Sequence, residues 1–279
     1  MVAALEELGT LSVSLGDPGG DPILEPGPGA TPLWPEVVVT ALLPSDADED
    51  AVRNRLARLP GQRLSDIGFN FIEERDWVRE FRENLSPVRF GEGLWICPPG
   101  MPCPDPAGVA ITLEPGLAFG SGSHPTTALC LQWLAGMGLR GLTVLDWGCG
   151  SGVLAIAALA LGAQAVTALD IDPQALRATE DNARRNGRSG ALRIADPAGL
   201  PPGERHDVLV ANILAGSLIA LAPTFNQHCK TGARVALSGI LAGQAEQVRD
   251  ACAPWLELHL AAELNGWALL AGSACGTGP

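Results

Sequence analysis

The residues best suited to chemistry lie in the segment 145–152, which reads LDWGCGSG. Three glycines, Gly148, Gly150 and Gly152, stand at alternate positions, and the carboxylate of Asp146 comes two residues before the first of them. Glycine allows both a sharp turn and the close approach of a ligand to the backbone. Apolar runs typical of a strand and a helix flank this segment, so we predict a ligand-binding strand-to-helix turn.

The spacing of the glycines decides between two classes of ligand. Dinucleotide folds use G-x-G-x-x-G and rest a pyrophosphate on the helix, whereas here the pattern is G-x-G-x-G and Asp146 is nearby. An anion is a poor neighbour for a pyrophosphate but a good one for a sulfonium with a free ammonium group. The next predicted strand ends in Asp170, where an acid can accept hydrogen bonds from ribose hydroxyls. We therefore predict S-adenosylmethionine (AdoMet) as cofactor; the alternative is a loop that merely needs small residues.

Two more polar residues follow predicted strands. Asp196 is placed where it could reach the adenine amino group, although it could also be a turn residue before Pro197. Asn212 follows an apolar strand, and its carbonyl could accept a hydrogen bond from an amine and aim the nitrogen lone pair at a methyl group. The alternative for Asn212 is capping of the next helix. We predict Asn212 as the catalytic residue.

These residues must be positioned by a sheet, and the pattern from residue 143 onward alternates strands with helices. Repeated strand–helix units predict a parallel, doubly wound, Rossmann-like α/β sheet with its ligands at the carboxyl ends of the strands. Asn265-Gly266 between two further apolar runs predicts a closing hairpin. The expected strands are 143–146, 165–169, 192–194, 208–211, 234–238, 255–260 and 267–270; the expected helices are 153–161, 173–186, 216–225 and 244–253.

The first part of the chain predicts a small α+β unit. A strand–helix–strand–strand pattern suits a ferredoxin-like module whose opening strand is missing. We expect residues 1–95 to form this N-terminal domain, 96–108 to be a Pro- and Gly-rich linker, and 109–279 to form the cofactor-binding domain. Within the first domain the expected helices are 2–8, 46–59 and 76–84, and the expected strands are 10–15, 36–43 and 68–73.

The composition of the chain limits the classes of function that are expected. The net charge of −13 over 279 residues is unfavourable for holding a nucleic acid backbone and favours a cationic partner. The seven scattered cysteines suggest neither a disulfide framework nor a zinc site, so we expect no metal. With no apolar run of bilayer length, we expect a cytoplasmic protein without membrane contact, and a monomer.

Several motifs together resemble the ribosomal protein L-eleven methyltransferase family (PrmA type), a group of class I methyltransferases. The resemblance covers nearly the whole chain. The motifs are EPGLAFGSGSHPTT at 114–127, DWGCGSG at 146–152, DIDP at 170–173, ANILAG at 211–216, and RDW at 75–77 with RFGEGLWIC at 89–97.

The resemblance implies AdoMet-dependent methylation of lysine side chains and the N-terminal amine of one large-subunit ribosomal protein, with the N-terminal domain recognising that protein. It implies AdoMet contacts at Thr127, Gly148, Asp170 and Asn212, with Phe119 in a loop that covers the cofactor. Thr127 and Phe119 come from the resemblance alone.

Other functions stay open from the sequence. A class I methyltransferase acting on another amine or amide is one; a glutamine-directed enzyme would carry Asn-Pro-Pro, which Asn212-Ile213-Leu214 lacks. A non-catalytic factor that binds AdoMet or the ribosomal protein is another. A nicotinamide oxidoreductase is disfavoured by Asp146 and the glycine spacing.

Overall fold

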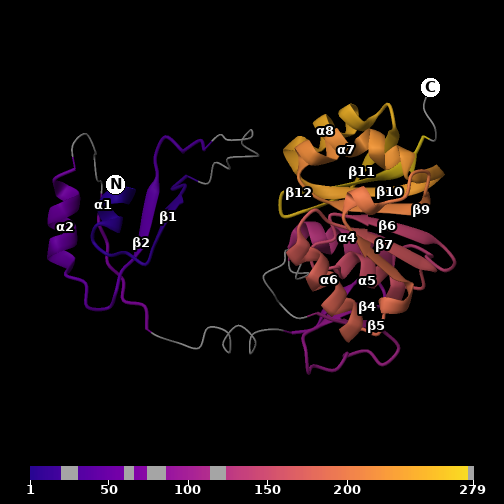
Figure 1. The fold of residues 1–279 in the computed structure, drawn as a ribbon, viewed down its shortest axis with the longest axis horizontal. Coiled ribbons are helices and arrows are strands. Elements are labelled where there is room, and N and C mark those ends of the chain that lie inside the picture. The colour runs from indigo at the N-terminus through magenta and orange to yellow at the C-terminus, as the bar shows by residue number, and fades with distance from the viewer. Residues whose placement is uncertain (20–30, 60–65, 74–85, 114–123, 276–279) are drawn as a thin grey trace. The chain divides into compact units, whose positions relative to one another are not determined.

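A computed structural model describes residues 1–19, 31–59, 66–73, 86–113 and 124–275. The chain divides into two compact units, residues 1–80 and residues 81–279 (Figure 1). Each unit has its own apolar core.

The larger unit is built on a seven-stranded sheet. Its strand order is β11-β12-β10-β9-β6-β7-β8, and β12 runs antiparallel to both of its neighbours, while the strands from β10 to β8 run parallel. The predicted Rossmann-like sheet and closing hairpin are therefore confirmed. The strands are β6 (Thr143–Trp147), β7 (Ala165–Leu169), β8 (Leu192–Ala195), β9 (His206–Asn212), β10 (Cys229–Leu241), β11 (Leu256–Leu264) and β12 (Trp267–Ala274).

Helices cover both faces of this sheet, as Figure 1 shows: α4, α5 and α6 lie on one side, and α7 and α8 on the other. Successive strand residues face opposite cores, so Val144 packs with α4 and α5 while Leu145 packs with α7 and α8. In the described residues, no helix combines the length and apolar character that crossing a bilayer requires. The helices are α4 (Pro125–Ala135), α5 (Val153–Ala160), α6 (Pro173–Arg185), α7 (Ala215–Gln227) and α8 (Ala245–Cys252), with short 3-10 turns η1 (Ser189–Ala191), η2 (Pro197–Gly199) and η3 (Ala242–Gln244).

A second, three-stranded sheet precedes the large one in the chain. It pairs β3 (Val88–Phe90), β4 (Leu94–Cys97) and β5 (Val109–Thr112), and its buried side chains join the core formed by α4 and α5. The domain boundary expected at residue 95 thus falls inside β4. The expected linker 96–108 begins with the last two residues of β4 and leads to β5, which pairs with β4. Burial of apolar strand residues on α4 and α5 keeps this sheet with the larger unit, so the chain divides near residue 80.

The smaller unit contains α1 (Val2–Glu6), a hairpin of β1 (Ser12–Gly16) with β2 (Val38–Leu42), and α2 (Glu49–Ala57). The prediction of a strand at 68–73 is wrong. Among the described residues, no strand pairs with residues 68–73, and Phe71 is 79% exposed. An extended segment without a hydrogen-bonded neighbouring strand is not stable as a β-strand. The predicted helix 76–84 lies outside the described residues.

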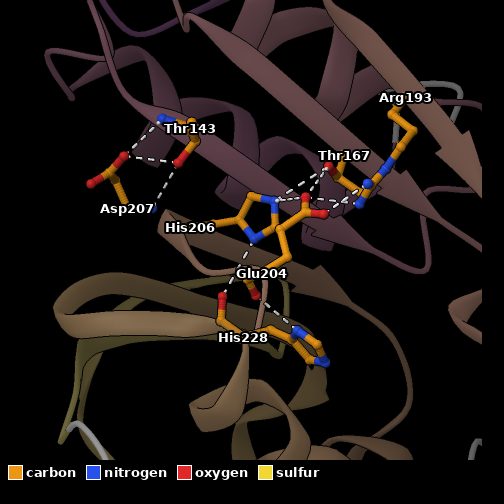
Figure 2. Close-up of polar contacts among 7 residues, drawn as sticks. All are labelled: Thr143, Thr167, Arg193, Glu204, His206, Asp207 and His228. Atoms are coloured by element: carbon orange, nitrogen blue, oxygen red, sulfur yellow. Dashed lines mark hydrogen bonds and ion pairs between the residues drawn. The ribbon is translucent and has the colours of Figure 1, made fainter. Parts of the chain in front are cut away.

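A polar network joins the amino ends of the strands in the larger unit, at the opposite edge from the glycine turn (Figure 2). Glu204 accepts hydrogen bonds from both terminal nitrogens of Arg193, at 2.7 and 2.8 Å. The buried His206 lies 3.3 Å from Thr167 Oγ1 through Nε2 and 3.4 Å from the carbonyl oxygen of His228 through Nδ1. Burial lowers the pKa of His206. These bonds fix the strand ends far from the predicted cofactor residues.

Candidate active site

The glycine turn between β6 and α5 needs glycine for two separate reasons. Gly148, Gly150 and Gly152 have φ of +81°, +55° and +78°, which is left-handed backbone that favours glycine. Two of them also lack room for a side chain: a Cβ on Gly148 would lie 2.3 Å from Ile213 Cγ2, and one on Gly152 would lie 2.7 Å from Thr179 Cγ2. The predicted turn is therefore fixed by backbone conformation and by close packing.

Asp170, at the end of β7, is tied directly to this turn. Its Oδ2 accepts a hydrogen bond from Gly150 N at 2.9 Å, and its Oδ1 accepts one from Asp172 N at 3.0 Å. The backbone of the turn also bonds to β7, because the N–H groups of Gly148 and Cys149 both donate to Leu169 O. The carboxylate is half-buried and stands at the carboxyl edge of the sheet, where the sequence placed it.

Asp146 is completely buried under the turn. Its Oδ2 accepts a hydrogen bond from Ala155 N at 3.0 Å, whereas its Oδ1 has no hydrogen-bond partner in the described part of the chain. Burial raises the pKa of this carboxyl to about 7, the charge of Asp170 adds to the rise, and the bond from Ala155 opposes it. One oxygen thus holds the start of α5, and the other is a buried acceptor suited to a cationic or hydrogen-bond-donating group.

Asn212 and Thr127, which are 85 residues apart in the chain, meet at the same edge of the sheet. The amide Nδ2 of Asn212 donates to Thr127 Oγ1 at 3.3 Å, and Thr127 is buried in the first turn of α4. Asn212 does not cap α7, because the N-cap residue of that helix is Leu214. With Nδ2 donating to Thr127, the carbonyl oxygen of Asn212 is the part of the amide that can accept a hydrogen bond from a ligand.

Comparison with known proteins decides the family. Residues 1–274 match the family model described as Ribosomal protein L11 methyltransferase (PrmA). This chain belongs to that family. Its members are AdoMet-dependent protein methyltransferases, and the described part of this site offers acceptors that suit the cofactor: the half-buried carboxylate of Asp170 beside the glycine turn, and a buried oxygen of Asp146 without a donor.

Individual relatives cover most of the chain. The ribosomal protein L11 methyltransferase of Pseudomonas paraeruginosa is 50% identical over 270 residues, which is 96% of this chain and 92% of the relative. That of Klebsiella pneumoniae is 48% identical over 273 residues, with the same coverage. The crystal structure of the ribosomal protein L11 methylase from Lactobacillus delbrueckii subsp. bulgaricus superimposes with a TM-score of 0.62 at 33% identity, covering 68% of this chain and 99% of that one.

His124 is the N-cap of α4, three residues before Thr127 of the predicted cofactor site. Its Nδ1 lies 2.7 Å from Thr126 Oγ1 and 3.4 Å from Thr126 N, and its ring packs edge-on against Trp267 with centroids 4.8 Å apart. Burial lowers the pKa of His124. The N–H of Thr126 needs an acceptor, so Nδ1 is unprotonated when it caps the helix.

Asp196 follows β8 at the same carboxyl edge of the sheet as Asp170, because Asp170 N donates a hydrogen bond to Ala195 O at 3.3 Å. Asp196 is exposed, and its Oδ1 accepts a hydrogen bond from Ala198 N at 2.8 Å, which makes it the N-cap of η2. Asp196 is therefore a turn residue, which was the alternative considered from the sequence. A contact between Asp196 and the adenine stays a prediction. Phe119 lies outside the described residues.

Two polar residues that the sequence motifs do not include, Thr179 and Asn182, also hold the glycine turn. Thr179 Oγ1 donates to Gly150 O at 3.1 Å, and Asn182 Nδ2 donates to Ser151 O at 2.9 Å. Their spacing could have indicated this role. Both residues lie on the stripe of α6 that also contains the buried Ala175, so this stripe faces the core.

Proposed function

We propose that this chain transfers methyl groups from AdoMet to amino nitrogens of ribosomal protein L11, on lysine side chains and the N-terminal amine. The observation that carries this proposal is the family match over residues 1–274. The meeting of Asn212 with Thr127 beside the glycine turn supports the assignment of the site.

We assign the cofactor contacts to residues around the carboxyl edge of the sheet. The backbone of Gly148 and Gly150 would lie against the cofactor, Asp170 would accept hydrogen bonds from the ribose hydroxyls, and Asp146 would balance the positive charge. The further assigned contacts are Thr127, Asn212, Asp196 at the adenine and Phe119 in the covering segment.

Bound AdoMet supplies an electrophilic methyl group on a sulfonium. The acceptor amine must be neutral to attack, and lysine has a reference pKa of about 10.4, so desolvation at the site favours the reactive form. Asn212 Oδ1 accepts a hydrogen bond from an amine N–H and so directs the nitrogen lone pair along the transfer line. The bond from Asn212 Nδ2 to Thr127 fixes which way the amide points. The contribution of these residues is therefore orientation.

We assign substrate recognition to the N-terminal unit, on the ground of its charge. Residues 1–80 contain 15 acidic and six basic residues, so this unit holds a net −9 of the chain's −13. A lysine-bearing ribosomal protein is a suitable partner for such a surface. We propose a monomer acting in the cytoplasm, because one chain supplies every assigned site residue and the substrate is ribosomal.

The test is incubation of the purified chain with AdoMet and unmethylated L11, followed by intact mass measurement of L11. Whole methyl increments are expected. Asn212→Ala should lower kcat by about 100-fold while changing the AdoMet Kd less than about threefold, because the residue orients the acceptor. Asp170→Ala should raise the AdoMet Kd by about tenfold or more, because a charge-assisted hydrogen bond is lost.

Two outcomes would contradict these assignments. AdoMet binding without any transfer to L11 would favour a non-catalytic binding factor or another substrate. Equal AdoMet affinity of Asp170→Ala and the wild type would remove Asp170 from the cofactor site.

A further inference from the structure

Helix α6 carries three polar side chains on one stripe. Thr179, Asn182 and Asn186 are spaced three and four residues apart, which places them on the same face of a helix. Thr179 is 0% exposed and Asn182 is 5% exposed. Buried polar groups are costly unless they are hydrogen-bonded, so the partners of this stripe are informative.

The first two members of the stripe bond to consecutive carbonyl groups of the cofactor turn. Thr179 reaches Gly150 O, and Asn182 reaches Ser151 O. A trans peptide places its C=O and the following N–H on opposite sides. Holding Gly150 O toward α6 therefore directs the N–H of Ser151 away from α6, while the N–H of Gly150 points to Asp170.

Thr179 is also packed tightly against the turn. Its Oγ1 lies 3.3 Å from Cys149 Sγ, and a Cβ on Gly152 would meet its methyl group and hydroxyl at 2.7 and 2.9 Å. The side chain thus contacts the turn at both ends, at Cys149 and at Gly152. A small rotation of any peptide in between would break a bond or create a clash.

The third member connects the stripe to another element. Asn186 Oδ1 accepts from Thr112 N at 2.8 Å, and its Nδ2 donates to Thr112 O at 2.7 Å. The amide therefore pairs with β5 as a neighbouring strand would. The same face of α6 therefore bonds both to the glycine turn and to the end of β5.

We propose that Thr179 and Asn182 are positioning residues for AdoMet, which act by fixing the peptide planes at Gly150 and Ser151 in the orientation that binds the cofactor. They do not touch the reacting atoms. Their loss changes the affinity for AdoMet through the turn, whereas kcat at saturating AdoMet is largely kept.

The experiment compares Thr179→Val with Thr179→Ser. Valine keeps the shape and removes the hydroxyl, so the AdoMet Kd measured by calorimetry should rise about tenfold, as expected when a buried carbonyl loses its donor. Serine keeps the hydroxyl and should hold the Kd within about twofold to threefold of the wild type. Hydrogen exchange of the ligand-free protein should be faster at residues 148–153 in Thr179→Val than in Thr179→Ser.

Thr167→Val is the matched control. Thr167 is also a buried threonine, 5% exposed, but its hydroxyl bonds in the network at the other edge of the sheet (Figure 2). This variant should lose stability and keep the AdoMet Kd. If Thr179→Val folds and binds AdoMet as tightly as Thr167→Val does, the proposal is overturned. If Thr179→Val does not fold, Asn182→Ala decides, and an unchanged Kd there overturns the proposal equally.

Discussion

At the scale of single residues, the two oxygens of Asp146 are in different situations. One is bonded to Ala155 N, and the other is buried with no donor among the described residues. Leaving a buried carboxylate oxygen unbonded disfavours its charged form. The raised pKa of about 7 follows, with burial as its largest cause.

We predict that AdoMet affinity rises with pH between about 5.5 and 7, because the cationic cofactor favours ionised Asp146 and binding releases a proton. The slope should approach about tenfold per pH unit below the pKa of the free protein. The stability of the ligand-free protein depends on pH in the opposite direction. Because the pKa of Asp146 in the folded protein lies above its ordinary value of 3.8, the contribution of this group to stability falls as pH rises from about 4 to about 7.

Calorimetry in two buffers of different ionisation enthalpy measures the released proton directly. Asp146→Asn is the control, since it removes the titrating group and should make the affinity independent of pH in this window. A wild-type affinity that is flat between pH 5.5 and 7 would show that Asp146 does not sense the cofactor.

At the scale of elements, α6 shows how a helix can serve a site that it does not enter. Its N-terminus has Asp172 as N-cap and a proline at the first helical position. Its stripe then bonds to the turn and to β5. The strands carry the site residues, and the helix fixes their loops.

We predict that Asn186→Ala lowers the free energy of unfolding by about 2 kcal/mol, because both backbone groups of Thr112 lose their partner. Urea unfolding followed by tryptophan fluorescence measures this. Gln174→Ala, an exposed change at the other end of α6, should stay within about 0.5 kcal/mol of the wild type. Equal stability of the two variants would mean that the Asn186 bonds contribute nothing net.

At the scale of the whole molecule, the two units differ in charge. The N-terminal unit holds a net −9, and residues 81–279 hold the remaining −4. Long-range attraction of a cationic partner by such a charge is screened by salt.

We predict that KM for L11 rises severalfold between about 50 and 300 mM salt, because screening weakens the encounter, while the AdoMet Kd changes less than about twofold. Steady-state kinetics with each substrate varied in turn measures both. A KM for L11 that is independent of salt would argue against recognition through the acidic unit.

The large sheet, the glycine turn and the polar residues at the carboxyl edge of the sheet could be predicted from the sequence alone. Periodicity and turn chemistry are local, and the carboxyl ends of parallel strands must share one edge, so Gly148, Asp170 and Asn212 could be placed together. The predicted hairpin at Asn265-Gly266 is local in the same way and is confirmed.

The contacts between distant segments are seen only in the folded protein. Examples are the hydrogen bond between Asn212 and Thr127 and the bonds from α6 to the glycine turn. The unbonded oxygen of Asp146 is a further example, because its isolation depends on which segments surround it. A local sequence pattern carries no information about such distances. The same reason explains the wrong prediction of a strand at 68–73 and the division of the chain near residue 80. A strand at 68–73 needs a partner, and the place of β3 and β4 depends on which core buries their apolar residues.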